Sequence, residues 1–207
     1  MKIDLSNIKN IIFDLGNVLL NLDFDASIKA FQKLGSDGEV LDHKNAYSHP
    51  VFYNFEVGKI SPAEFRTGIR RILNRPDISD ETIDRAWYAM ILDIPAKRVK
   101  VLQELDKKYN IYLFSNTNQI HIDNLLQEFK AEHGIDFPSL FKGVYYSHEI
   151  HDRKPELSSF KKVIELSGVK PEETLFVDDL EKNIIGAEQA GLKTLWLKKE
   201  MEMAELF

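Results

Sequence analysis

The sequence contains no cysteine among its 207 residues. Without cysteine there can be no disulfide, no thiol nucleophile and no zinc site built on thiolates. No apolar run approaches the ~18 residues that a membrane-spanning helix needs, and residues 1–5 lack the basic and apolar segments of a secretion signal. The net charge of -6 argues against binding to nucleic acid, which requires a basic surface. We therefore expect a cytoplasmic protein that has neither a nucleic-acid nor a membrane partner.

The composition that remains is that of a soluble globular protein. Hydrophobic residues make up 43% of the chain and charged residues 29%. A chain of 207 residues can form one α/β domain with a smaller appendage, but not two large domains.

Short apolar segments rich in β-branched and aromatic residues alternate with helical patterns over most of the chain. The expected strands are Ile8–Phe13, Ile111–Phe114, Val144–Tyr146, Thr174–Val177 and Thr194–Leu197. Because helices separate them, this order predicts a Rossmann-like, doubly wound parallel sheet of five core strands. We expect the core to comprise residues 1–22 and 96–207, with a helical domain of residues 23–95 inserted after the first strand.

The inserted region carries helix signals only. Residues Ser61–Glu64 form a capping box with proline at the first helical position, and Ser79 begins a further helix. We expect its aromatic residues to build a core of its own, namely Phe52, Tyr53, Phe55 and Trp87.

Polar residues stand after the expected core strands, at their carboxyl ends. Asp14 follows the first strand, Ser115 the second and the pair Asp178-Asp179 the fourth, while Lys154 stands in the loop after the third. Because the carboxyl ends of parallel strands meet at one edge of a sheet, these side chains are expected to converge there.

The converging residues suggest phosphoryl chemistry. Three carboxylates at one place need a cation, since like charges would otherwise raise at least one pKa, and Mg2+ binds both carboxylates and phosphate oxygens. Ser115, Lys154 and the amides after the strands would hold the remaining phosphate oxygens. Asp14 would attack phosphorus in line and form an acyl phosphate that water hydrolyses. The sequence thus predicts a Mg2+-dependent phosphatase whose partner is a small phosphorylated metabolite.

Four short motifs in this order resemble those of the haloacid dehalogenase superfamily. They are Phe13-Asp14-Leu15-Gly16-Asn17-Val18, Phe114-Ser115-Asn116-Thr117-Asn118, Arg153-Lys154-Pro155-Glu156 and Phe176-Val177-Asp178-Asp179. The helical insertion is similar to the small α-helical cap domain of that superfamily. The Asp-Leu-Gly-Asn form of the first motif is similar to that of bacterial phosphatases acting on glucose 1-phosphate.

The resemblance implies roles for individual residues. The catalytic residues would be Asp14 as nucleophile, Ser115 and Lys154. The phosphate-binding residues would be Leu15, Ser115, Asn116 and Lys154. The ligands of Mg2+ would be Asp14, Gly16, Asp178 and Asp179. Glu56, Lys59 and Arg66 in the cap would be candidates for contacts with sugar hydroxyls.

Gly16 departs from the pattern of the superfamily. Most of its phosphatases have a second aspartate at this position, whose side chain protonates the leaving group and whose backbone carbonyl binds the metal. Glycine keeps the carbonyl but loses the acid, a group worth on the order of 100-fold to 10,000-fold in rate. Three explanations stay open: turnover is slow, the proton comes from water or a cap residue, or the leaving group hardly needs a proton. An anomeric leaving group, as in a sugar 1-phosphate, would need that acid less.

Two other functions stay open on this sequence. One is a metal-free haloacid dehalogenase that uses the same Asp14, against which the pair Asp178-Asp179 argues. The other is a phosphate-binding regulatory protein whose activity lapsed with the general acid, against which the retention of the other motifs argues. His148 and His151 are interpreted as surface residues.

Overall fold

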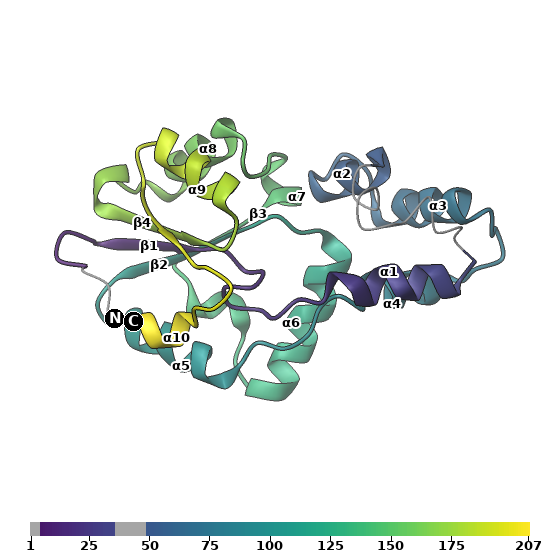
Figure 1. Cartoon of the computed structure of the whole chain (residues 1–207), viewed down its shortest axis with the longest axis horizontal. Helices are drawn as coiled ribbons and strands as arrows, with labels where there is room; N and C mark the ends of the chain where they lie inside the picture. Colours follow the sequence, from purple (N-terminus) through teal and green to yellow (C-terminus); the bar gives the residue numbers. More distant parts are fainter. Residues whose placement is uncertain (1–4, 36–48) are drawn as a thin grey trace.

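The computed structural model describes residues 5–35 and 49–207 and contains one parallel five-stranded sheet (Figure 1). The strands are β1 (Asn10–Phe13), β2 (Asn110–Ser115), β3 (Gly143–Tyr146), β4 (Thr174–Asp178) and β5 (Lys193–Trp196). Their order in the sheet is β3-β2-β1-β4-β5, and every neighbouring pair is parallel. The predicted five-stranded doubly wound sheet is thereby confirmed. β1 occupies the centre, as its uninterrupted run of buried residues requires.

Helices cover both faces of the sheet. The helices of this core are α5 (Ala96–Leu105), α6 (Gln119–His133), α7 (Ser147–Ile150), α8 (Leu157–Ser167), α9 (Glu181–Gln189) and α10 (Met203–Leu206), with 3-10 turns η1 (Phe137–Leu140) and η2 (Pro171–Glu173). Since successive side chains of a strand point to opposite faces, Ile11 and Phe13 pack with α5, α6 and α10, whereas Ile12 packs with α8 and α9. Lys154 and Pro155 precede α8, which begins at Leu157.

Within the described residues between β1 and α5, four further helices extend away from the sheet (Figure 1). They are α1 (Phe24–Lys33), α2 (Pro50–Glu56), α3 (Pro62–Leu73) and α4 (Asp80–Tyr88). Both predicted N-caps are present, with a complete capping box at Ser61 and a side-chain cap from Ser79. Their buried side chains form a separate hydrophobic cluster centred on Phe65, against which Trp87 packs. These helices form the inserted cap. Its boundaries at residues 23 and 95 stay a prediction. Residues 36–48 of that range lie outside the described residues.

Three of the four cap aromatics lie in that cluster, as expected. Tyr53 does not: its side chain is 42% exposed and lies at the edge of a pocket between cap and core. In the described part of the chain, no helix is long and apolar enough to cross a bilayer. Residues 1–4, where a secretion signal was considered, fall outside the described ranges.

Candidate active site

Asp14 lies at the carboxyl end of the central strand. Its backbone amide donates to the carbonyl of Val177 (2.9 Å), so the sheet holds the residue although β1 ends at Phe13. The side chain is buried and faces a cavity of about 350 Å³ between the sheet edge and the cap. That volume is suited to a small metabolite.

Lys154 is an almost completely buried charge next to Asp14. Its Nζ atom lies 2.7 Å from Asp14 Oδ1 and 2.7 Å from Asp178 Oδ2, while the rings of Phe114 and Phe176 flank it at 5.2 and 5.3 Å. Burial alone would lower the pKa of Lys154, but the two carboxylates raise it above its usual value. The lysine therefore remains a cation beneath the cavity.

The backbone of Lys154 is held by Asn116, the residue that follows β2. The amide of Lys154 donates to Asn116 Oδ1 (3.0 Å), and Asn116 Nδ2 donates to the carbonyl of Lys154 (2.9 Å). This reciprocal pair ties the loop after α7 to the loop after β2. Two of the predicted phosphate-binding segments are thus one rigid unit.

The predicted acidic residues come together as well. Asp14, Asp178 and Asp179 each offer a carboxylate oxygen within 4.8 Å of the others. Burial and, to a smaller extent, the neighbouring carboxylates raise the pKa of Asp14 to about 7, although Lys154 opposes this. Burial also raises the pKa of Asp179. A hard divalent cation would relieve this repulsion, and the all-oxygen donor set fits Mg2+.

The two consecutive aspartates have different surroundings. Asp178 is fully buried behind Lys154, and its oxygens accept from the amide of Leu180 (2.9 Å) and from Asn183 Nδ2 (2.9 and 3.0 Å) as well as from the lysine. Asp179 lines the cavity, and its Oδ2 accepts from Asn17 Nδ2 at 3.1 Å. Asp178 thus orients the lysine, whereas Asp179 keeps oxygen atoms facing the cavity.

The remaining predicted residues also lie at this edge. Leu15, Gly16, Ser115 and Asn116 all line the cavity. The Oγ atom of Ser115 has only a 3.5 Å contact with the carbonyl of Asn116 among the described residues, which leaves it available to a ligand. An ideal Cβ built at Gly16 would lie 2.7 Å from Leu22 Cδ1, so an apolar side chain fills the place beside this glycine.

Sequence reasoning missed Asn17 and Asn183 as partners of the two aspartates. Asn17 has a φ of 54°, a left-handed conformation that asparagine tolerates and that turns its amide toward Asp179. The position of Asn17 inside the first motif was the only feature of the sequence that could have indicated this role. Asn183, in the first turn of α9, had no comparable signal.

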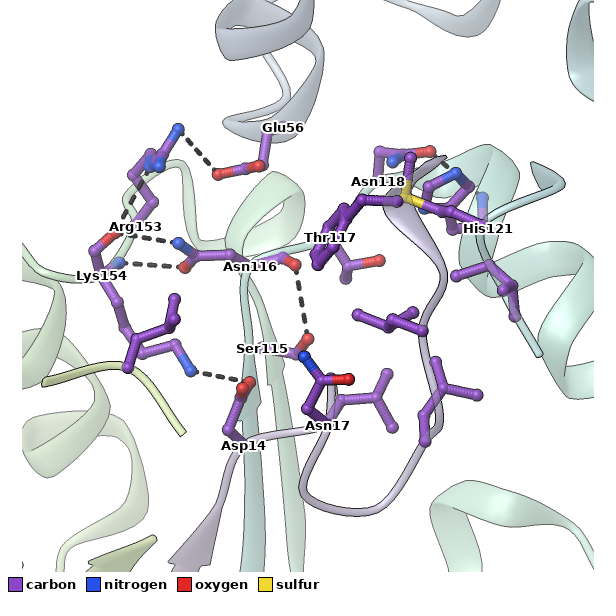
Figure 2. Close-up of a pocket in the computed structure, with 18 of the residues that line it drawn as sticks. Asp14, Asn17, Glu56, Ser115, Asn116, Thr117, Asn118, His121, Arg153 and Lys154 are labelled. Carbon is purple, nitrogen blue, oxygen red and sulfur yellow. Dashed lines mark hydrogen bonds and ion pairs between the residues drawn. The ribbon is translucent and has the colours of Figure 1, made fainter. Parts of the chain in front are cut away.

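The cap contributes the opposite wall of the cavity. Glu56, the last residue of α2, forms an ion pair with Arg153 (Nη1 to Oε1, 2.9 Å), and Figure 2 shows both side chains across the site from Asp14. Of the other cap candidates, Arg66 pairs with Asp84 inside the cap, and Lys59 lies over the ring of Tyr53 at 5.3 Å. Neither of these two lines the cavity.

Two histidines join the cap to the core. His121 stacks on Trp87 at 4.8 Å, its Nε2 lies 3.1 Å from the carbonyl of Trp87, and burial lowers its pKa to about 4, so it is neutral near pH 7. His151 was interpreted as a surface residue. Although its side chain is exposed, its Nδ1 lies 3.1 Å from the carbonyl of Val57, next to Glu56.

The carboxyl edge of the doubly wound sheet carries a buried Asp–Lys pair and an acidic cluster, and a helical cap covers both. This arrangement is that of a hydrolase with a covered site. The profile of the haloacid dehalogenase-like hydrolases matches residues 8–191. The chain belongs to this family, as the four motifs predicted.

Several characterised proteins are similar to the chain over nearly its whole length. It is 32% identical to D-ribitol-5-phosphate phosphatase of Bacteroides thetaiotaomicron, over 90% of each chain. It is 26% identical to glyceraldehyde 3-phosphate phosphatase of Pyrococcus furiosus, covering 92% of this chain and 81% of that one. A haloacid dehalogenase family enzyme of B. thetaiotaomicron in complex with magnesium and inorganic phosphate superposes with a TM-score of 0.83 at 36% identity, covering 97% of this chain and 99% of that one.

Proposed function

We propose that the protein is a Mg2+-dependent phosphatase that hydrolyses a small sugar or polyol phosphate through an aspartyl phosphate on Asp14. The observation that carries the proposal is the buried Lys154, which lies 2.7 Å from both Asp14 and Asp178 under a cavity lined by Asp179. A cation held between a carboxylate nucleophile and a metal cluster suits a dianionic phosphoryl group.

The reaction consists of two displacements at phosphorus, the first by Asp14 and the second by water. Asp14 Oδ attacks phosphorus, the new P–O bond forms, and the bond to the leaving oxygen breaks as that oxygen takes a proton. Lys154, the Ser115 hydroxyl and the amides of Leu15 and Asn116 hold the phosphoryl oxygens during this step. Water then attacks phosphorus, which restores the Asp14 carboxylate and releases phosphate.

The metal ligands would be Asp14, Asp179 and the carbonyl of Gly16, with Asp178 adjacent. Bound there, Mg2+ would neutralise charge on the phosphoryl oxygens. Asp178 serves chiefly to hold Lys154, since its oxygens already accept hydrogen bonds from three described residues.

The chemistry named in the relatives favours an open-chain substrate. Ribitol 5-phosphate and glyceraldehyde 3-phosphate, the substrates named in two relatives, carry phosphate on a primary hydroxyl. The cavity of about 350 Å³ is of a size for such molecules. We therefore propose this class ahead of the anomeric phosphates, which the Asp-Leu-Gly-Asn motif alone suggested.

An assay of phosphate release from ribitol 5-phosphate, glyceraldehyde 3-phosphate and glucose 1-phosphate tests the proposal. We expect activity with Mg2+, loss of activity with EDTA, recovery on adding Mg2+ back, and a phosphorylated protein that the Asp14→Asn variant cannot form. Hydrolysis that continues in EDTA would refute the metal requirement. Halide release from a 2-haloacid would support the dehalogenase alternative, and phosphate binding without turnover would support a regulatory protein.

A further inference from the structure

Glu56 and Arg153 form an ion pair that joins the cap to the core at the far end of the cavity. Glu56 comes from α2 and Arg153 from the loop that carries Lys154. In Figure 2 the pair lies at one end of the drawn site and Asp14 at the other, with Asn116 between them. A phosphate ester seated on Asp14 and Lys154 would therefore direct its organic part toward this pair.

Both members retain hydrogen-bonding capacity. Glu56 Oε1 is buried and lies 2.9 Å from Arg153 Nη1, yet within the described part of the chain it accepts no aligned hydrogen bond. The guanidinium makes a long contact from Nε to the carbonyl of Lys154 (3.4 Å). The contact between the two side chains is thus electrostatic, which leaves an acceptor and planar donors for a third molecule.

The pair is held in place from three sides. The carbonyl of Glu56 accepts from the hydroxyl of Ser147 (2.7 Å), and Arg153 Cζ lies 5.6 Å from the centre of the Tyr53 ring. The amide of Arg153 donates to Asp152 Oδ1 (2.8 Å). Such support orders the side chains before a ligand arrives and reduces the entropy lost on binding.

The charges of the pair define what it can bind. An arginine alone would favour a carboxylate or a second phosphate, but Glu56 cancels that charge and repels an anion. Burial raises the pKa of Glu56 although Arg153 opposes this, so a hydrogen-bond donor from a ligand would stabilise the carboxylate. Neighbouring hydroxyl groups offer both a donor for Glu56 and an acceptor for Arg153.

We propose that Glu56 and Arg153 bind neighbouring hydroxyl groups on the uncharged, polyhydroxylated leaving group of the substrate. The proposal rests on the phosphatase function proposed above and assigns the selection of the substrate to one residue from the cap and one from the core. It predicts that the enzyme distinguishes its substrates by the hydroxyls and charge at the end remote from phosphorus.

The experiment compares three phosphate esters in Glu56→Gln and Arg153→Lys variants. Ribitol 5-phosphate has the hydroxyls, para-nitrophenyl phosphate lacks them, and 3-phosphoglycerate carries a remote carboxylate. We expect each variant to lose roughly 10- to 100-fold in kcat/KM on ribitol 5-phosphate, the value of one or two hydrogen bonds to charged groups. On para-nitrophenyl phosphate the loss should be less than about 3-fold, and Glu56→Gln should improve kcat/KM for 3-phosphoglycerate.

Matched controls are Glu81→Gln and Arg85→Lys, exposed substitutions of the same kinds on α4, which should change none of the three activities. An equal loss on all three esters would overturn the proposal, since the pair would then act only in holding the cap. Unchanged kinetics, or a wild-type preference for 3-phosphoglycerate, would overturn it too. Failure of the phosphatase proposal gives a different result, because the wild-type protein would then hydrolyse none of the esters.

Discussion

Replacing Gly58 by alanine should separate the cap from the core at one point. Gly58 follows α2 and has a φ of 66°, a conformation that costs an L-residue about 1–2 kcal/mol. An ideal Cβ on it would lie 2.1 Å from the carbonyl oxygen of His148 on α7. Because that neighbour is backbone, the two segments must move apart.

The movement would cost the hydrogen bonds beside Gly58. Ser147 Oγ donates to the carbonyl of Glu56 (2.7 Å), and His151 Nδ1 lies 3.1 Å from the carbonyl of Val57. At about 0.5–1.5 kcal/mol each, their loss amounts to about 1–3 kcal/mol beyond the backbone strain. This energy disfavours the closed arrangement of cap and core by about 5- to 150-fold.

Alanine variants of two other glycines serve as controls that separate the energy of this contact from the backbone strain. Gly134 and Gly168 have φ values of 67° and 68°, and no described atom lies within 4 Å of a Cβ built at either position. Alanine at each should therefore cost the strain alone. We expect Gly58→Ala to lose about 1–3 kcal/mol more stability in urea denaturation than the other two variants, and it alone should lose kcat/KM on ribitol 5-phosphate, by about 5- to 150-fold. Wild-type kcat/KM in Gly58→Ala would refute the role of this contact in closure.

Two further predictions concern buried charges. Asp178→Asn should lower the free energy of unfolding by about 3 kcal/mol in urea denaturation, because it removes a buried partner of Lys154. Asp179→Asn should chiefly weaken Mg2+ binding, which a metal titration measures. Arg98 contacts both carboxylate oxygens of Glu202 (2.9 and 3.2 Å) and lowers its pKa to about 2. Since the folded pKa lies below the usual 4.5, the pair stabilises the fold above about pH 4.5 and loses this effect as the pH falls toward 2. At pH 7 we expect Arg98→Met to be about 1–3 kcal/mol less stable than the wild type in urea denaturation. This difference should shrink as the pH falls from about 4.5 toward 2, and a constant difference would contradict a stabilising Arg98–Glu202 pair.

The sheet and the helix starts could be predicted because their signals are local. β1 is a run of buried residues, and Ser61 lies at the expected distance from Glu64, so neither needed knowledge of distant contacts. The gathering of Asp14 and Lys154 could also be predicted, because parallel strands bring their carboxyl ends to one edge.

Side-chain directions at the site could not be predicted in this way. Asp178 and Asp179 are adjacent in sequence and carry the same group, but one is buried against Lys154 and the other lines the cavity. The pair of Glu56 and Arg153 depends on how the cap sits on the core, which no periodicity encodes. The sequence therefore left two things undetermined: the different roles of the two adjacent aspartates, and the residues of the cavity wall opposite the nucleophile.

Gly16 shows how a structure alters a prediction made from a motif. Restoring the absent acid by Gly16→Asp should raise turnover on poor leaving groups, but the new side chain would meet Leu22 Cδ1 at 2.7 Å from its Cβ. This atom is the end of a flexible side chain at the cavity wall, so Leu22→Ala should make room. We expect Gly16→Asp alone to gain little, and the double variant to exceed Leu22→Ala by about 100-fold in kcat on an alkyl phosphate. On para-nitrophenyl phosphate, whose leaving group needs no proton, the two should be equal. A double variant no faster than Leu22→Ala on the alkyl ester would show that the leaving oxygen already receives its proton from another group.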